Sequence, residues 1–147
     1  MISDLNHFNN LSPPLSPNNQ EIQIYEKYCE NTEKILLLGY TKELMHLCTN
    51  AMDINPPNNP KIIKQDWFTI STFHDTIIGD GVLNLVGGDL VGYLSKYCNT
   101  LIIRFFTEKI NTMKYATNFR DNTSFLLPDL IIDTQPKCKI LIWKFSH

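Results

Sequence analysis

Residues 35–53, ILLLGYTKELMHLCTNAMD, contain the pattern that decides the fold. The four apolar residues 35–38 show no polar alternation and end at Gly39, which is typical of a strand buried on both faces of a sheet. Thr41 has the residue type that caps a short helix, and a second strand then ends near Asp53. A strand, a short helix and a strand in this order predict a parallel pair within an α/β domain.

The segments around this stretch extend the same pattern. Asn18 and Glu21 have the spacing of a capping box, and the apolar residues after them predict a helix over residues 19–32. The segment INPPNNP at residues 54–60 contains three prolines and is incompatible with a helix. The crossover helix after the second strand is therefore expected to be missing or replaced by a loop. Other predicted elements are strands at residues 61–64, 75–78 and 101–106 and helices at residues 89–97 and 107–119.

The amino-terminal end has a different composition from the rest of the chain. Residues 1–19 contain three prolines and five asparagines with few apolar residues, which is typical of an extended, mobile arm. A disordered tail or a lid over a site are the alternative interpretations. The whole chain has 147 residues, of which 43% are apolar, and this suffices for one compact core. We expect a flexible arm over residues 1–18 and a single domain over residues 19–147.

Charge and cysteine usage restrict the partners. The formal net charge is −2 and the basic residues are scattered, so no basic stripe is present to attract DNA or a large RNA. A short or single-stranded nucleic acid is not excluded. The four cysteines lie far apart without a C-x-x-C pair, so zinc-binding spacing is absent and no metal site is predicted. They are expected to be small buried apolar residues in a reducing compartment.

The sequence also indicates where the protein is expected to reside. The start MISDLNHFNN lacks the basic and apolar regions of a signal peptide, and no apolar run approaches the ~20 residues that cross a bilayer. We therefore expect a cytoplasmic protein. A homo-oligomer is compatible with the sequence.

Polar turns follow four of the predicted strands. In open α/β sheets, ligands bind beyond the carboxyl ends of the strands, where these turns meet. Each turn is by itself explained by turn or cap formation, but three acids closing three successive apolar strands indicate a ligand. The turns are Gly39-Tyr40-Thr41, Asp53, Asp66-Trp67 and Gly79-Asp80-Gly81.

A nucleoside would give each turn a physical task. Gly39 allows close approach of the backbone, and the helix start at Thr41 would offer free amides to an anion. Asp53 is placed to accept both hydroxyls of a ribose. Asp66 could accept an amino proton of adenine, with Trp67 as a flat apolar wall for the ring.

Five segments together resemble class I S-adenosylmethionine-dependent methyltransferases, specifically divergent members with LLLG-x-T-x-EL and GDG-x-LN motifs. They cover about half of the chain. The segments are ILLLGYTKEL, AMDIN, IIKQDWFTI, HDTIIGDGVLNLV and LIIRFF. The resemblance implies that S-adenosylmethionine is the cofactor, with Gly39 and Asp53 at its methionyl and ribose parts and Asp66 and Trp67 at the adenine. Asp80 would face the methionyl amino group or the substrate.

The resemblance also implies a fold. We expect a Rossmann-like three-layer sandwich with a mainly parallel sheet, in which residues 131–132 and 139–145 form a closing antiparallel hairpin. The first motif departs from the family pattern, because it lacks the usual acid and the second and third glycines. No NPPY or DPPY string follows the fourth strand, which argues against methylation of amino groups in nucleic-acid bases.

Few side chains are needed for catalysis, since methyl transfer from a sulfonium depends mostly on an in-line approach. If a base is required, Asp80 and His74 are the nearest candidates and His46 is a weaker third. Both histidines also fit loop or surface positions. Gly81 would leave Asp80 accessible, and Asn84 could hold a polar group of the substrate or simply form a turn or cap.

The favoured function is therefore a methyltransferase acting on a small molecule. A non-catalytic S-adenosylmethionine-binding or partner-docking protein is the first alternative, and the reduced glycine motif favours it. A lyase that cleaves S-adenosylmethionine without an acceptor is the second. A nicotinamide dehydrogenase is disfavoured because G-x-G-x-x-G does not follow the first strand.

Overall fold

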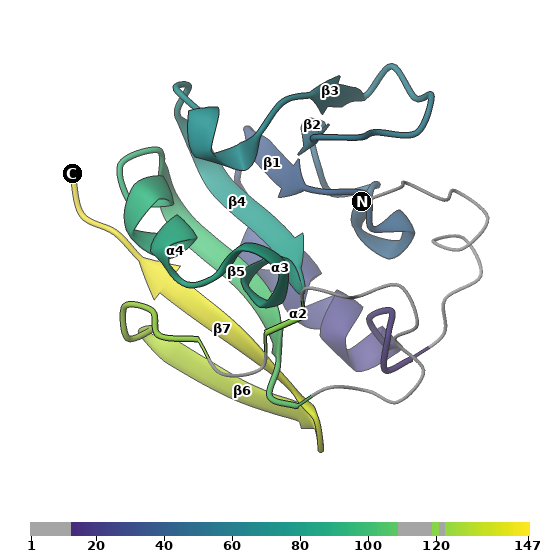
Figure 1. Ribbon diagram of the computed structural model, residues 1–147, viewed down its shortest axis with the longest axis vertical. Helices are drawn as coiled ribbons and strands as arrows, with labels where there is room; N and C mark the ends of the chain where they lie inside the picture. The colour runs from purple at the N-terminus through teal and green to yellow at the C-terminus, as the bar shows by residue number, and fades with distance from the viewer. Residues whose placement is uncertain (1–12, 109–118, 121–122) are drawn as a thin grey trace.

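A computed structural model describes residues 13–108, 119–120 and 123–147 of the chain. Within these residues, seven strands form one sheet in the order β3-β2-β1-β4-β5-β7-β6 (Figure 1). The strands are β1 Ile35–Leu38, β2 Asn50–Asp53, β3 Ile62–Lys64, β4 His74–Asp80, β5 Cys98–Phe106, β6 Leu130–Gln135 and β7 Cys138–Lys144. The helices are α2 Asn19–Cys29, α3 Val82–Val86 and α4 Asp89–Leu94, with 3-10 turns η1 Lys42–Leu44 and η2 Trp67–Thr69.

The strand directions confirm the mainly parallel sheet. Strands β1 to β5 pair in parallel, with β1 in the centre between β2 and β4. Strand β7 is antiparallel to β5 and to β6, so it is inserted between β5 and β6 and closes the sheet. The carboxyl ends of β1 to β5 therefore lie along one edge, where the sequence predicts a ligand.

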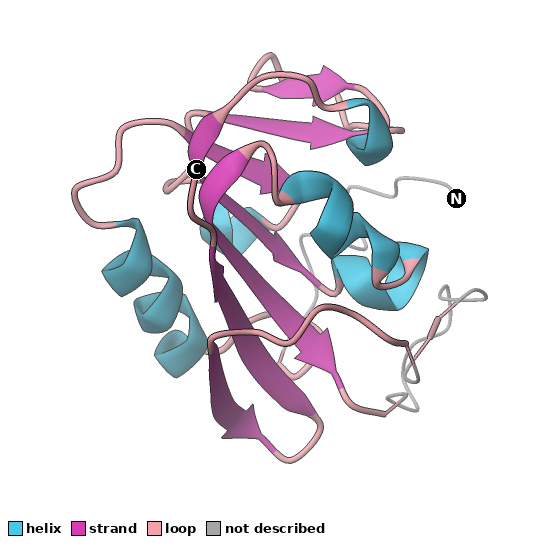
Figure 2. Cartoon of the chain, turned by 90° about the vertical axis from the view of Figure 1, so that its left-hand side faces the viewer, coloured by secondary structure: helices cyan, strands magenta, loops and turns pink. Residues whose placement is uncertain are grey.

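Helices cover both faces of the sheet, as Figure 2 shows, and this confirms the three-layer sandwich. On one face, Leu36 and Leu38 of β1 pack in a cluster with residues of α3 and α4. On the other face, Ile35 and Leu37 pack with Tyr25 of α2. Both faces of β1 are thus buried, which explains why its apolar run has no alternation. All four cysteines are buried free thiols.

The short helices differ from the predicted ones. The helix expected after Thr41 is a 3-10 turn of three residues, and the Thr41 side chain makes no cap hydrogen bond. A helix of this length does not present the free amides of an α-helix start. Helix α3 was not predicted, because it has only five residues between Gly81 and Gly87, a spacing that also fits a loop. Residues 54–60 contain no helix, as expected.

Residues that precede the predicted domain boundary at residue 19 already contact the folded domain. Asn18 and Glu21 form the predicted capping box of α2. Ser16 is 4% exposed, and the carbonyl oxygen of Leu15 accepts a hydrogen bond from the side chain of Arg104. The last residues of the expected arm are therefore part of the folded domain. Most of the helix predicted at 107–119 lies outside the described residues.

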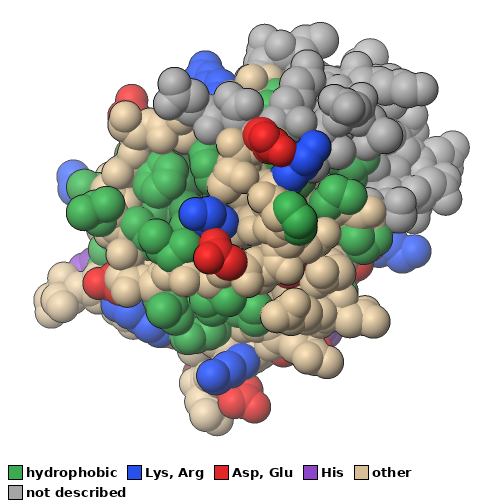
Figure 3. Space-filling model, turned by 90° about the horizontal axis from the view of Figure 1, so that it is seen from below, with side chains coloured by type: hydrophobic (Ala, Val, Ile, Leu, Met, Phe, Trp, Pro, Cys, Tyr) green, Lys and Arg blue, Asp and Glu red, His purple; other side chains and the backbone are tan. Residues whose placement is uncertain are grey.

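The β6 edge of the sheet carries exposed apolar side chains. Leu130 and Ile131 of the edge strand β6 are 40% and 51% exposed. Hydrophobic side chains are visible among polar ones on the face seen in Figure 3. A homo-oligomer remains a prediction.

In the part of the chain that the structure describes, no helix has the length and apolar content to cross a membrane.

Candidate functional site at the carboxyl edge

Three of the predicted site residues lie side by side on adjacent strands. Leu38 of β1 pairs with Met52 on one side and with Gly79 on the other. The next residues along the three strands are Gly39, Asp53 and Asp80. Because neighbouring strands are about 4.8 Å apart, these three residues form a row at the carboxyl edge.

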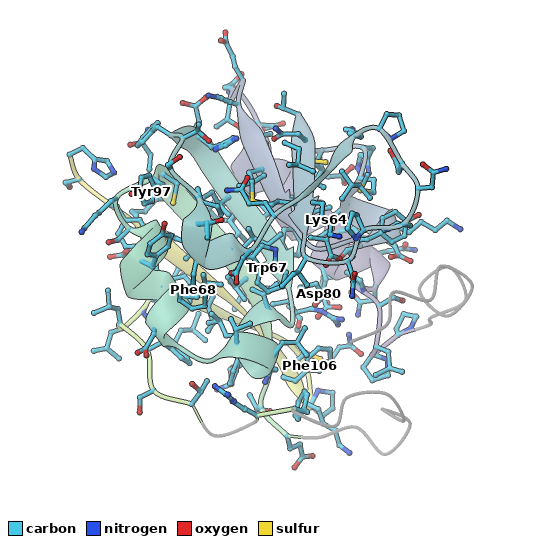
Figure 4. The ribbon with its side chains drawn as sticks, turned by 45° about the horizontal axis from the view of Figure 1, so that its top comes forward. Lys64, Trp67, Phe68, Asp80, Tyr97 and Phe106 are labelled. Atoms are coloured by element: carbon cyan, nitrogen blue, oxygen red, sulfur yellow. The ribbon has the colours of Figure 1, made fainter. Side chains whose placement is uncertain are left out.

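The Trp67 side chain lies against the part of this row that β1 and β2 contribute. Its indole Nε1 donates a hydrogen bond of 2.7 Å to the carbonyl oxygen of Met52. A Cβ atom placed on Gly39, whose φ is +83°, would lie 3.5 Å from the Trp67 ring. Figure 4 shows Trp67 and Asp80 at this edge. Gly39, which was predicted to allow close approach of a ligand, thus also allows close approach of the Trp67 ring.

Asp53 and Asp66 both shape the backbone around the row. Asp53 is 6% exposed, and its Oδ1 accepts a hydrogen bond of 3.1 Å from the Asn55 N–H. Asp66 is exposed and caps η2, because its Oδ1 accepts from the Phe68 N–H at 2.9 Å. Asp53 thereby orders the start of the proline-rich loop, and Asp66 orders the turn that carries Trp67.

Asp80 forms a salt bridge that the sequence did not indicate. The Nε of Arg104 donates to Oδ1 of Asp80 at 2.6 Å, and Nη2 donates to Oδ2 at 3.0 Å. The Nη1 of the same guanidinium donates to Oε1 of Glu21 at 3.1 Å. Tyr25 joins the network, since its hydroxyl donates to the Gly79 carbonyl and accepts from the Arg104 N–H. We call Glu21, Arg104 and Asp80 the buried triad.

Between Asp80 and Arg104, the attraction of opposite charges opposes the effect of burial on both pKa values. Burial raises the pKa of the Asp80 carboxyl, and the adjacent Arg104 guanidinium lowers it again in part. Burial alone would lower the pKa of Arg104, but the Asp80 and Glu21 carboxylates raise it overall. Both Asp80 oxygens already accept hydrogen bonds from Arg104, so the geometry favours a fixed negative charge over proton abstraction.

The loops beside the row contain the remaining predicted cofactor residues. Tyr40 is partly buried against the cluster of α2 and β1, and Thr41 precedes η1. Gly81 has a φ of +68° and starts α3, and its N–H donates to the Arg104 carbonyl at 2.9 Å. These residues are at the carboxyl edge, as predicted, but the anion site expected at Thr41 has no helix to provide it.

Asn84 is used within the fold. It is 1% exposed, and its amide donates to the carbonyl oxygens of Phe106 and Arg120 at 2.9 and 2.6 Å. Its Oδ1 accepts from the Phe106 N–H at 3.0 Å. The amide therefore joins α3 to β5 and to the segment at residue 120. This geometry gives Asn84 a structural role, because its side-chain nitrogen and oxygen both bond within the fold and not, as the sequence had suggested, to a substrate group.

The two candidate histidines lie away from the row. His74 is the first residue of the seven-residue strand β4 and Asp80 is its last, so about 20 Å of extended chain separates them. His46 is exposed and lies 3.2 Å from Glu26 of α2. The predicted strand at residues 75–78 already implied that His74 and Asp80 lie at opposite ends of β4. We assign neither histidine to catalysis.

Burial of His74 predicts a pH dependence of stability. The side chain is 3% exposed, and burial lowers the pKa of its imidazole from the ordinary value of about 6.5. The unfolded chain therefore binds a proton more readily than the folded chain. The resulting stability is fully present above about pH 6.5 and is lost as the pH falls below it.

Urea unfolding of the native chain and of His74→Gln at pH 5 to 8 measures this contribution. The difference between the two free energies of unfolding should change in favour of the variant as the pH falls. A difference independent of pH would contradict the assignment.

No protein-family model and no curated protein matches the sequence. Solved structures do match. Magnesium protoporphyrin IX methyltransferase from Synechocystis PCC 6803, with bound S-adenosylmethionine, has a TM-score of 0.56 at 16% identity over 86% of this chain and 79% of that one. The N-terminal domain of EvdMO1 with bound S-adenosylhomocysteine has a TM-score of 0.55 at 10% identity, over 98% and 85% of the two chains. WbdD has a TM-score of 0.58 at 14% identity, over 98% and 48%. The chain therefore has the Rossmann-like fold of class I S-adenosylmethionine-dependent methyltransferases.

Proposed function

We propose that the chain binds S-adenosylmethionine at the carboxyl edge of β1, β2 and β4 and transfers its methyl group to a small-molecule acceptor. The observation that carries this proposal is the row of Gly39, Asp53 and Asp80 beside Trp67. A fold of this kind binds ligands at that edge. The Synechocystis methyltransferase of similar fold was solved with S-adenosylmethionine bound, which supports the choice of ligand.

The residues of the row fit the parts of this ligand. Asp53 would accept hydrogen bonds from the ribose hydroxyls with its carboxylate. Trp67 would provide an apolar surface for the adenine ring, and Asp66 would accept from the adenine amino group. Asp80 would place a negative charge near the methionyl part, which carries an ammonium and a sulfonium.

The contribution of the chain to catalysis is positioning. S-Adenosylmethionine would supply a methyl group already activated by the positive sulfur, which an acceptor can take by in-line displacement. Holding the two reactants in line is the main requirement of such a step. The row and the Trp67 ring would fix one reactant. We assign no general base, because Asp80 is held by Arg104 and the two histidines lie elsewhere.

Calorimetric titration with S-adenosylmethionine and with S-adenosylhomocysteine tests the proposal directly. We expect both to bind at the same site in a one-to-one complex. The two tryptophans, Trp67 and Trp143, allow the site to be located, because Trp143 is 1% exposed and lies on β7, which does not contribute to the row. The fluorescence change on binding should persist in Trp143→Phe and disappear in Trp67→Phe. Failure of both ligands to bind folded protein at millimolar concentration would refute the proposal.

Incubation with S-adenosylmethionine alone separates transfer from cleavage. A methyltransferase should leave the cofactor intact until a small-molecule acceptor is added. Release of methylthioadenosine and a lactone without any acceptor would instead identify a lyase. Mass spectrometry of the mixture, with the Asp53→Ala variant as the inactive reference, distinguishes the two.

A further inference from the structure

The buried triad contains two acids and one base. Arg104 contacts Glu21 at 3.1 Å and Asp80 at 2.6 Å, and the side chains of Arg104 and Glu21 are both 0% exposed. Two carboxylates against one guanidinium leave one net negative charge when all three groups are ionised. An unbalanced charge in a buried position is costly unless a further partner of opposite sign meets it.

The other groups that hydrogen-bond to the triad within the described residues are neutral. Glu21 accepts from the Thr134 hydroxyl at 2.6 Å and from the Gln135 amide at 2.8 Å. Arg104 donates to the carbonyl oxygen of Leu15 at 3.1 Å and contacts the Cys138 sulfur at 3.7 Å. These contacts satisfy the hydrogen-bonding groups of the triad without supplying a second cation.

The net negative charge of the triad is accessible to a ligand only at Asp80. The Asp80 side chain is 8% exposed, whereas those of Glu21 and Arg104 are fully covered. Asp80 also belongs to the row, on the β4 side of Gly39. Burial is the main cause that raises the pKa of Asp80; Arg104 lowers it, and the nearby carboxylates of Glu21 and Glu43 raise it again. A cation bound at this edge would relieve the repulsion.

We propose that Arg104 and Glu21 are positioning residues that hold Asp80 as a fixed anion, and that the net negative charge of the triad selects the positively charged S-adenosylmethionine over its product. This inference rests on the proposed function. In the transfer, a lone pair of the acceptor forms a bond to the methyl carbon while the bond between that carbon and sulfur breaks; the electron pair of the broken bond stays on sulfur, which becomes neutral, and any proton that the acceptor loses goes to solvent. S-Adenosylhomocysteine keeps its ammonium but loses the sulfonium charge, so the triad attracts it less and favours its release.

The ratio of the two dissociation constants measures this selection. For the native chain we expect S-adenosylmethionine to bind about tenfold more tightly, the effect of one additional charge in a partly desolvated site. Glu21→Gln keeps the shape and one acceptor oxygen but removes the excess charge. Because Glu21 is fully covered, it does not touch a ligand at this edge. The variant should bring the ratio close to one while S-adenosylhomocysteine affinity changes less than about twofold.

Two further variants separate charge from structure. Arg104→Lys keeps the positive charge but loses the two-point contact, so Asp80 is held less firmly and both ligands should bind more weakly. Asp133→Asn removes an exposed carboxylate of β6, whose side chain is 80% exposed, and should leave the ratio unchanged. Thermal unfolding of each variant shows whether it is folded at the titration temperature.

The outcomes distinguish this inference from the function on which it rests. If neither ligand binds the native chain, the proposed function fails. If both bind and the native ratio is one or favours the product, charge selection is refuted without recourse to a variant. A ratio that favours S-adenosylmethionine and stays the same in folded Glu21→Gln would also overturn it, because the selection would then come from contacts and not from the charge of the triad.

Discussion

Arg104→Met is expected to lower the free energy of unfolding by about 3–5 kcal/mol at neutral pH, the cost of leaving buried charges without their partner. The variant retains the length and apolar stem of the side chain but removes the guanidinium. Glu21 and Asp80 would then face each other with side chains 0% and 8% exposed and no cation between them. Urea unfolding followed by circular dichroism measures the loss.

Lys139→Met is the matched control, because it also replaces a cation by methionine. Lys139 lies 3.7 Å from Asp133, and the two side chains are 44% and 80% exposed. An exposed pair of this kind contributes about 0–1 kcal/mol. A loss in Arg104→Met no larger than in this control would show that the triad does not stabilise the fold.

Asp53→Ala is expected to weaken S-adenosylmethionine binding by about a hundredfold or more. Two hydrogen bonds from ribose hydroxyls to a carboxylate contribute roughly 1.5–3 kcal/mol each, and about 2.7 kcal/mol corresponds to a hundredfold change in affinity. Calorimetry on the folded variant measures the change. Unchanged affinity would refute the assignment of Asp53 to the ribose. It would also weaken the assignment of Gly39 and Asp80 to the same binding site.

Asp53→Asn controls for the local role of this side chain. Its amide oxygen can still accept from the Asn55 N–H, as Oδ1 of Asp53 does at 3.1 Å. The loop after β2 should therefore keep its conformation and the thermal unfolding temperature should change little. Affinity should nevertheless fall by at least about tenfold, because an amide can accept only through one of its two polar atoms. A loss of affinity confined to Asp53→Ala would indicate loop disruption and not a ligand contact.

Local patterns predicted much of the fold. The flat apolar run of β1, the capping box at Asn18 and the prolines of residues 54–60 each act over a few residues, and each has the predicted result. The order of strands and helices then predicted a mainly parallel sheet. Because carboxyl ends of parallel strands share one edge, the sequence also predicted that Gly39, Asp53 and Asp80 lie together.

Such local patterns could not predict contacts between side chains that are far apart in the sequence. Arg104 lies in an apolar strand, 24 positions from Asp80 and 83 positions from Glu21, and nothing local links them. An arginine within a strand as buried as β5 is itself a signal, since a buried charge requires partners. This signal places Arg104 beside an acid but does not identify which acid.

The sequence by itself determined which segments are buried strands, where they end and which polar residues follow them, because these properties depend on near neighbours in the chain. Only the tertiary structure decided the partners of those residues. The placement of β5 next to β4 joined Asp80 to Arg104, and the turn after β3 laid Trp67 against Gly39. Such contacts join residues that are distant in sequence, so they are set by the order of strands in the sheet and by the side chains that fill the space between its layers.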